Sequence, residues 1–349
     1  MRHCFLNTAL THMSAGMKYL DLFSGMGGFT RGLLDAGFTF DWHGFSEIDK
    51  YAKRLYAALY PGAEDMGDVK AIDDRRLLER FGQHGIDIIT FGFPCQDLSI
   101  AGNRKGLEGK RSGLFFEALR IIKTVQPPCF IFENVKGLLQ CGEGRDFKTV
   151  LQSIADLGLY DCQWQLCNTN WFLPQDRERI YFVGLLGGQR KFGQEIFPIR
   201  EADIFCAVKR QTQKEEKQSA QCLQARDYAN WNGNFVKVGT MRSFKDKYSQ
   251  SVCDENGFRE TKSGNCPNIL ARAREDGNMQ PCLKEGETIR RLTPLECFRL
   301  QFGMENASNM IAKAKELGIS DTQLYKMAGN AVSSPVVQLI AERLKCKPD

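Results

Sequence analysis

The chain has 349 residues, and its 47 lysine and arginine residues exceed its 42 aspartate and glutamate residues, giving a formal net charge of +5. Hydrophobic residues make up 42% of it, which excludes a disordered or collagen-like protein. Because it has no apolar run of about 18 residues and no secretory signal, we expect neither a membrane span nor export. The 13 cysteines are an odd number without paired metal-ligand spacing, so we expect reduced thiols in a cytoplasmic protein that holds no metal.

Short apolar runs alternate with amphipathic segments from Lys18 onwards, whereas residues 1–16 carry no pattern and are expected to be an N-terminal extension. The predicted strands are Lys18–Phe23, Phe40–Ser46, Ile86–Phe91, Cys129–Phe132, Tyr160–Cys167 and Ile180–Leu185. The predicted helices are Phe29–Gly37, Lys50–Tyr60, Leu114–Val125 and Phe147–Leu157. This alternation is typical of an α/β fold, and it predicts a Rossmann-like, doubly wound parallel sheet.

The ends of the predicted strands carry acidic residues. Asp21, Glu47 and Glu133 lie at or beside such ends. In open α/β sheets, ligands bind beyond the carboxyl ends of the strands, and an acid after the second strand suits ribose hydroxyls. The glycines between Gly25 and Gly28 allow close approach of the backbone to a ligand at a helix start. Asp68 is either a further ligand contact or a helix cap.

The regular pattern ends after Gly188, and the chain to about residue 288 is rich in Gln, Asn and Gly. Between residues 205 and 250 it carries nine basic and four acidic residues. Helices are predicted again at Thr293–Leu300, Ala307–Leu317 and Pro335–Leu344. We therefore expect one discontinuous domain over 17–186 and 288–349, interrupted by a smaller, irregular domain over 187–287.

Candidate chemical groups gather around these strand ends. Cys95 follows Pro94 at a strand-to-loop junction, a position where thiolates gain reactivity, although most cysteines are inert core residues. Glu133 follows an apolar run, and burial would let its carboxyl stay protonated and donate to a ring nitrogen. Arg177 and Arg179 share one face of a strand by its period of two, unless this segment is an exposed, charge-paired edge.

In order and spacing, several of these segments resemble the cytosine carbon-5 DNA methyltransferases of bacteria and phages. The segments are Asp21–Phe29, Gly92–Gln96, Phe132–Val135, Gln175–Arg179, Arg290–Cys297 and Gly329–Val332. The resemblance covers about 18–186 and 288–335. Ala331 stands where the family usually has serine, which affects one contact near the cofactor.

The resemblance implies S-adenosylmethionine as cofactor, S-adenosylhomocysteine as product and no metal. Phe23 and Ile48 would contact the adenine, and Glu47 would hold the ribose. Asn330 and Val332 would close the methionine end. The full cofactor site implied in this way is Phe23, Gly25, Gly28, Glu47, Ile48, Asp68, Val69, Pro94, Asn330 and Val332.

The resemblance also implies a covalent reaction on a cytosine flipped out of double-stranded DNA. Cys95 would attack carbon-6, and Glu133 with Arg177 and Arg179 would hold the target base. Residues 187–287 match the variable target-recognition domain. The candidates for DNA contact are Gln96 and Ser99 in the loop after the nucleophile and Arg226, Arg242, Arg272 and Arg274 in that domain.

Three alternatives stay open at this stage. They are an RNA cytosine methyltransferase, a catalytically silent DNA-binding relative and a nucleotide-dependent oxidoreductase on the same sheet. The intact Cys95 and Glu133 argue against the silent relative, and the oxidoreductase leaves Gln175–Arg179 without a task. We expect a monomer. Its recognition sequence, a cognate restriction endonuclease and the base that removes the carbon-5 proton stay undetermined.

Overall fold

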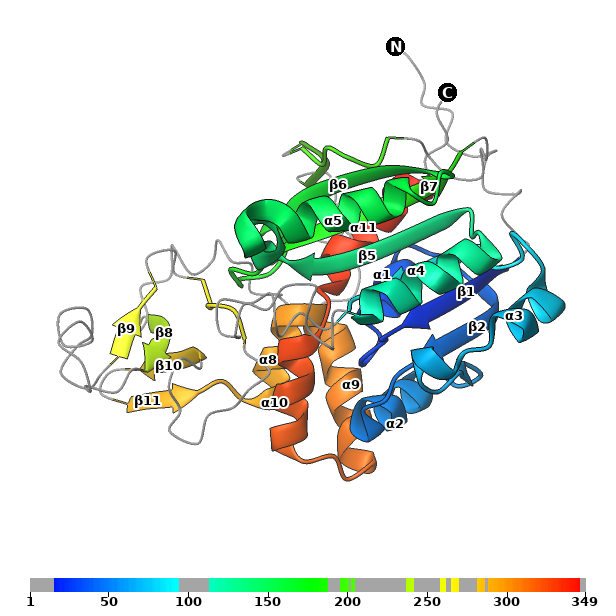
Figure 1. Ribbon diagram of the computed structural model, residues 1–349. Coiled ribbons are helices and arrows are strands. Elements are labelled where there is room, and N and C mark those ends of the chain that lie inside the picture. Colours follow the sequence, from blue (N-terminus) through cyan, green and yellow to red (C-terminus); the bar gives the residue numbers. More distant parts are fainter. Residues whose placement is uncertain are drawn as a thin grey trace, which may run out of the picture.

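The computed structural model contains two β-sheets, of seven and four strands, and a set of helices packed mainly on the larger sheet (Figure 1). It describes residues 16–93, 113–187, 195–200, 202–204, 237–241, 258–261, 265–269, 281–285 and 288–345. Within these residues, no helix is long and apolar enough to cross a membrane.

The large sheet has the strand order β3-β2-β1-β4-β5-β7-β6. Its strands are β1 (Met17–Leu22), β2 (Phe40–Ser46), β3 (Glu64–Asp65), β4 (Ile88–Phe91), β5 (Cys129–Val135), β6 (Tyr160–Asn168) and β7 (Glu178–Leu186). Strands β1 to β5 are parallel, which confirms the predicted doubly wound arrangement. The predicted parallel direction does not extend to β7, which runs antiparallel to β5 and β6. The connection 169–177 between β6 and β7 is too short for a crossover between parallel strands.

Every predicted helix is present, with ends that differ by a few residues. The α-helices within the described residues include α1 (Gly28–Asp35), α2 (Lys50–Leu59), α3 (Asp74–Phe81), α4 (Gly113–Val125), α5 (Arg145–Ala155), α8 (Pro294–Phe302), α9 (Met304–Glu316), α10 (Asp321–Asn330) and α11 (Ser334–Lys345). Short 3-10 helices lie at η1 (Val69–Ala71), η3 (Lys136–Leu139), η4 (Cys141–Gly144) and η5 (Thr169–Trp171). Helices α3 and α10 are not among the helices predicted from the sequence. In α3 only Leu77 is buried, so the apolar period that marks a helix is weak.

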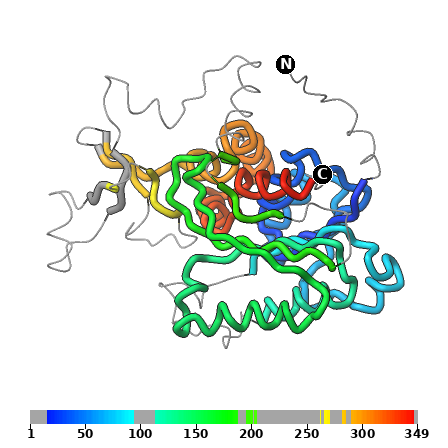
Figure 2. The backbone as a smooth tube through the Cα atoms, turned by 90° about the horizontal axis from the view of Figure 1, so that it is seen from above, coloured from blue at the N-terminus to red at the C-terminus, as the bar shows by residue number. Residues whose placement is uncertain are grey.

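The two faces of the large sheet pack against different helices. On one face Phe132 and Phe182 stack with ring centroids 4.2 Å apart, within a cluster that includes residues of α3, α4 and α5. On the other face Ile131 joins Leu33 of α1 and Ile340 of α11. Seen from above, α5 and α11 lie on opposite sides of the sheet (Figure 2). Both faces are therefore covered, as a buried parallel sheet requires.

Helices α8, α9 and α10 form a third cluster with residues of α2 and with Cys266 and Ile269. The second sheet lies beside the large one, with the order β11-β10-β8-β9 (Figure 1). Its strands are β8 (Lys237–Met241), β9 (Phe258–Glu260), β10 (Pro281–Glu285) and β11 (Thr288–Arg291). Strand β11 thus pairs with the second sheet and leads directly into α8.

The carboxyl of Asp21 is fully buried beneath the carboxyl edge of the sheet and joins four elements. It accepts hydrogen bonds from Thr90 Oγ1 of β4 at 2.7 Å, Thr30 Oγ1 of α1 at 2.9 Å and Tyr56 OH of α2 at 3.2 Å. Burial raises the pKa of Asp21 to about 7, although these hydroxyl donors oppose the change. The described contacts give this carboxyl no cationic partner, so its ionised form is stabilised by the hydroxyl donors alone.

We predict that Asp21 makes the fold less stable as pH rises towards neutrality. Because its pKa is higher in the folded chain than in the unfolded chain, the folded state binds more protons between about pH 4 and pH 7. The free energy of unfolding should therefore fall as pH rises through this range, by about 2–4 kcal/mol.

Urea denaturation at several pH values measures this slope in the wild type and in Asp21→Asn, which cannot ionise. The slope should be shallower in Asp21→Asn and unchanged in Asp161→Asn, where the carboxyl is exposed. Equal slopes in wild type and Asp21→Asn would show that another group titrates.

Candidate active site

The turn after β1 lies against the C-terminal segment. Phe23, Gly25 and Gly27 have φ angles of 53°, 56° and 88°, so the chain turns sharply in the left-handed region. A Cβ atom on Gly28 would lie 2.5 Å from the carbonyl oxygen of Val332, whereas a Cβ atom on Gly25 would meet no atom within 4 Å. The turn is therefore pressed against Val332 on one side and has open space on the other.

Glu47 connects this turn to the start of α2. Its Oε2 accepts a hydrogen bond from the amide of Gly25 at 2.8 Å, and its Oε1 accepts from the amides of Ile48 and Asp49, both at 2.7 Å. The side chain of Ile48 is 74% exposed. A carboxylate held by three amides and an exposed apolar side chain thus lie side by side at the end of β2.

Asp68 and Val69 lie at the start of η1. Asp68 Oδ1 accepts from the amide of Lys70 at 3.0 Å, so Asp68 is the cap of this 3-10 helix. The side chain of Val69 is only 2% exposed and packs in the core. A ligand contact by Val69 would therefore use its backbone.

Glu133 and Arg179 form a buried ion pair on adjacent strands. Arg179 Nε lies 2.8 Å from Glu133 Oε1, and both side chains are 11% exposed. The end of β4 reaches the same place, since a Cβ atom on Gly92 would lie 3.7 Å from Glu133 Oε2 and 3.7 Å from Val332 Cγ2. Three parts of the chain therefore meet here: the Glu133–Arg179 ion pair, the end of β4 at Gly92, and Val332 between α10 and α11.

Arg177 is only 3% exposed, so the exposed, charge-paired edge is the wrong interpretation of this residue. Its Nη1 donates to Asn268 Oδ1 at 2.7 Å, its Nη2 donates to Ala331 O at 2.5 Å, and both lie 3.3 Å from Gly329 O. Burial, together with the charge of Arg179, lowers the pKa of Arg177. Although the two arginines lie close together, their hydrogen-bond and ion-pair partners differ.

Three amide side chains, those of Gln175, Gln301 and Asn268, have weak signals in the sequence. Gln175 and Gln301 are fully buried, and Gln301 Nε2 donates to Gln175 Oε1 at 3.1 Å. Gln175 belongs to the Gln175–Arg179 segment that the sequence singled out. Nothing in the sequence indicates that Gln301 is its hydrogen-bond partner. Asn268 lies in the irregular region, where no pattern distinguishes it from the other amides.

The remaining expected site residues lie outside the described residues: Pro94, Cys95, Gln96, Ser99, Arg226, Arg242, Arg272 and Arg274. Among the residues that the structure does describe, no group of His, Cys, Asp and Glu side chains could hold a metal ion.

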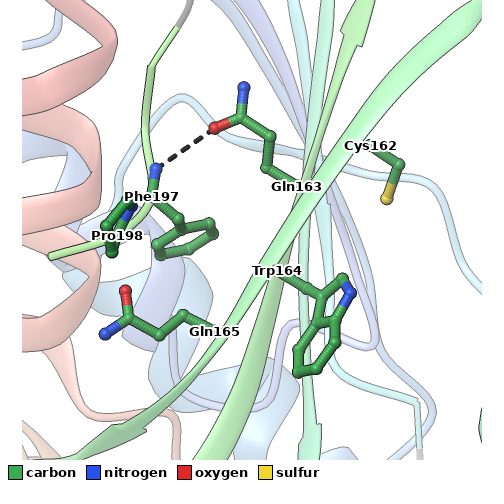
Figure 3. Close-up of a pocket in the computed structure, with 6 residues that line it drawn as sticks. All are labelled: Cys162, Gln163, Trp164, Gln165, Phe197 and Pro198. Atoms are coloured by element: carbon green, nitrogen blue, oxygen red, sulfur yellow. Dashed lines mark hydrogen bonds between the residues drawn. The ribbon is translucent and has the colours of Figure 1, made fainter.

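A shallow pocket on edge strand β6 is separate from this site. Gln163 and Gln165 point towards the segment Phe197–Pro198, whereas Cys162 and Trp164 point the opposite way (Figure 3). Gln163 Oε1 accepts from the amides of Ile196 at 2.9 Å and Phe197 at 3.1 Å. Glutamine side chains thus hold a chain segment along the sheet edge, and none of the expected site residues lines the pocket.

Comparisons with known proteins cover nearly the whole chain. The family model described as C-5 cytosine-specific DNA methylase matches residues 17–346. The Type II methyltransferase M.Bsp6I of Bacillus sp. (strain RFL6) is 31% identical over 335 residues, or 94% of this chain and 98% of that protein. The orphan methyltransferase M.SPRI of Bacillus phage SPR is 28% identical over 94% of this chain and 97% of its own length. The solved Entamoeba histolytica methyltransferase EhMeth shares the fold, with a TM-score of 0.63 at 15% identity over 94% of this chain and 97% of that one.

We predict that Glu47→Gln weakens the binding of S-adenosylhomocysteine by about 1–3 kcal/mol, or roughly 5- to 150-fold, as for the loss of a hydrogen bond to a charged group. The amide keeps the shape but replaces one carboxylate oxygen with a donor. Isothermal titration calorimetry measures the change, and Glu117→Gln on α4, which removes a carboxylate paired with Arg120, is the control. Unchanged affinity in Glu47→Gln would show that this carboxylate does not bind the ligand and only accepts hydrogen bonds from the amides of Gly25, Ile48 and Asp49.

Proposed function

Since the chain belongs to the C-5 cytosine-specific DNA methylase family and is a DNA cytosine-5 methyltransferase, we propose how it acts. It transfers a methyl group from S-adenosylmethionine to carbon-5 of a cytosine flipped out of a specific double-stranded DNA sequence, through a covalent Cys95 adduct at carbon-6. The observation that carries this proposal is the buried Glu133–Arg179 pair on β5 and β7, which Gly92 after β4 approaches together with Val332. The family assignment removes the oxidoreductase alternative.

The residues beside the turn suit the proposed cofactor, which when bound supplies an electrophilic methyl group. The open space at Gly25 and the exposed Ile48 offer room and apolar surface for the nucleoside. Glu47 lies beside both, and a carboxylate is the group that accepts from ribose hydroxyls. Phe23, Gly28, Asp68, Val69, Pro94, Asn330 and Val332 complete the proposed cofactor site.

Cys95 is the proposed nucleophile, and the other cysteines that the structure describes support this choice. Burial raises the pKa of Cys162, Cys167 and Cys297 to about 12. Burial raises the pKa of Cys129 also. At neutral pH these thiols would therefore stay protonated and would be poor nucleophiles. Cys95, in contrast, follows Gly92 by three residues in the chain, and Gly92 approaches Glu133.

The proposed reaction activates carbon-5 by addition at carbon-6. The Cys95 thiolate forms a bond to carbon-6, the ring electrons shift, and Glu133 delivers a proton to N3. This addition would make carbon-5 nucleophilic towards the methyl group that the bound cofactor would supply. A base then removes the carbon-5 proton, the bond to carbon-6 breaks, Cys95 departs as thiolate and N3 returns its proton to Glu133.

Arg179 is the proposed donor to the carbon-2 oxygen, where negative charge develops after the thiolate adds. Its ion pair with Glu133 keeps both groups on one surface of the sheet. Because both groups are buried and carbon-6 is covered by stacking in duplex DNA, the cytosine must leave the helix to reach them.

DNA recognition is assigned to residues 187–287, with Arg226, Arg242, Arg272 and Arg274 towards the DNA and with Gln96 and Ser99 in the loop after the nucleophile. The separate four-stranded sheet, of which β8, β9 and β10 lie in this region, supports a second functional unit. We propose a monomer that acts in the cytoplasm. The relatives include Type II and orphan methyltransferases, so action with a cognate restriction endonuclease and action alone both fit the family.

A duplex that carries 5-fluorocytosine in the target sequence should trap the enzyme covalently when S-adenosylmethionine is present, because fluorine cannot leave carbon-5 as the proton does. Denaturing electrophoresis should show the adduct with wild-type protein and none with Cys95→Ser. Cys162→Ser, which changes a thiol on the far edge strand, is the control and should still be trapped. Peptide mapping that places the adduct on a cysteine other than Cys95 would overturn the assignment.

Plasmid DNA from cells that express the chain, but lack their own cytosine methylation, should carry 5-methylcytosine at one short sequence. Bisulfite sequencing of plasmid and of total RNA measures this directly, and the Cys95→Ser variant should leave both unmodified. Methylated cytosines in RNA with none in the plasmid would favour the RNA alternative and contradict the proposed substrate.

A further inference from the structure

Three parts of the chain meet at Arg177. Its guanidinium contacts Asn268 in the second domain and the carbonyls of Gly329 and Ala331 at the end of α10. Its own backbone is fixed by the β6–β7 connection, because its amide donates to Asn168 Oδ1 at 2.9 Å and its carbonyl accepts from Thr169 N at 3.0 Å. We call these contacts the Arg177 junction.

The second-domain segment 265–269 is attached to the large domain by more than this side chain. Cys266 N donates to Pro174 O, and Asp176 N donates to Cys266 O, both at 2.9 Å. Asn265 Nδ2 donates to Asp176 Oδ1 at 3.2 Å. Cys266 and Ile269 are 4% and 2% exposed within the cluster of α8, α9 and α10. This segment is therefore a docked part of the large domain, although it lies between strands β9 and β10 of the second sheet.

The partners of Arg177 belong to the two sites that the proposed reaction must bring together. Gly329 and Ala331 flank Asn330, and the following Val332 lies against the Gly28 turn. Asn268 belongs to the region assigned to DNA recognition. A buried guanidinium cannot replace a lost protein acceptor with water. When one acceptor moves, the guanidinium therefore moves with it, and its hydrogen bonds to the other acceptors change.

We propose that Arg177 is a positioning residue that couples the cofactor site to the second domain through its hydrogen bond to Asn268. This inference rests on the proposed function, because it takes the Gly28–Val332 region as the cofactor site. It assigns the base contacts to Glu133 and Arg179 and gives Arg177 a different task. Because coupling between sites is reciprocal, a cofactor that orders the 329–332 segment also stabilises the docked segment 265–269.

Hydrogen–deuterium exchange of the full chain, with and without S-adenosylhomocysteine, tests the coupling. In the wild type, the ligand should slow exchange of peptides from the Phe23–Gly28 turn and, by at least about fivefold, of peptides that cover 265–269. In Asn268→Ala the turn should still be protected, while the protection of 265–269 should disappear. Asn268→Asp keeps an acceptor oxygen for Arg177 and should restore it.

Asn306→Ala is the matched control, since it removes a half-buried amide that donates to Asp35 at 3.1 Å, away from the junction. This variant should behave as wild type. Protection of the turn without protection of 265–269 in the wild type, or equal protection of 265–269 in Asn268→Ala, would overturn the coupling. Absence of protection at the turn itself would contradict the proposed cofactor site.

Discussion

The close contact between α1 and the C-terminal segment is the constraint on which the rest of the structure depends. A Cβ atom on Gly28 would meet the Val332 carbonyl at 2.5 Å, and one on Gly32 would meet Val337 Cβ at the same distance. Glycine at both positions therefore lets α1 and the segment 332–337, which are far apart in the sequence, pack at close distance. This approach places Val332 against the turn after β1. The residues just before Val332, Gly329 and Ala331, accept hydrogen bonds from Arg177.

Buried charges at the carboxyl edge of the sheet are compensated in three different ways, and each way suits a different task. Glu133 and Arg179 neutralise each other at 2.8 Å. Arg177 is surrounded by carbonyl-type oxygens, which hold a cation in place but cannot take its proton. Asp21 has only hydroxyl donors, so burial dominates and raises its pKa to about 7. The pair holds a carboxyl and a guanidinium side by side on β5 and β7, whereas the other two sites mainly join elements of the fold.

Much of the fold and the outline of the site could be predicted from the sequence, because the information is local there. Apolar runs mark the strands, and acids after strands mark the edge where Glu47 and Glu133 lie. The antiparallel direction of β7 could not be predicted, since Ile180–Leu185 has the same apolar character in either direction and only the length of the connection constrains it. The hydrogen-bond partners of the Arg177 guanidinium are 91 and more residues away along the chain. A single asparagine such as Asn268 carries no local pattern that would indicate this contact.

Under the proposed function, the attachment of segment 265–269 serves two separate demands. The proposed recognition surface has to differ between enzymes with different targets, yet its position relative to the proposed catalytic groups has to be kept to within about an ångström for the base to be correctly placed. Cys266 N donates to Pro174 O and Cys266 O accepts from Asp176 N, and these backbone hydrogen bonds do not depend on side-chain identity. Side-chain contacts such as Asn268 to Arg177 then add the dependence on neighbouring segments that a purely backbone attachment lacks. Segment 265–269 thus gives the region of the second sheet a docked contact with the large sheet in addition to the direct connection from β11 to α8. Under the proposed function, this contact would keep the recognition region in a fixed position relative to the catalytic groups.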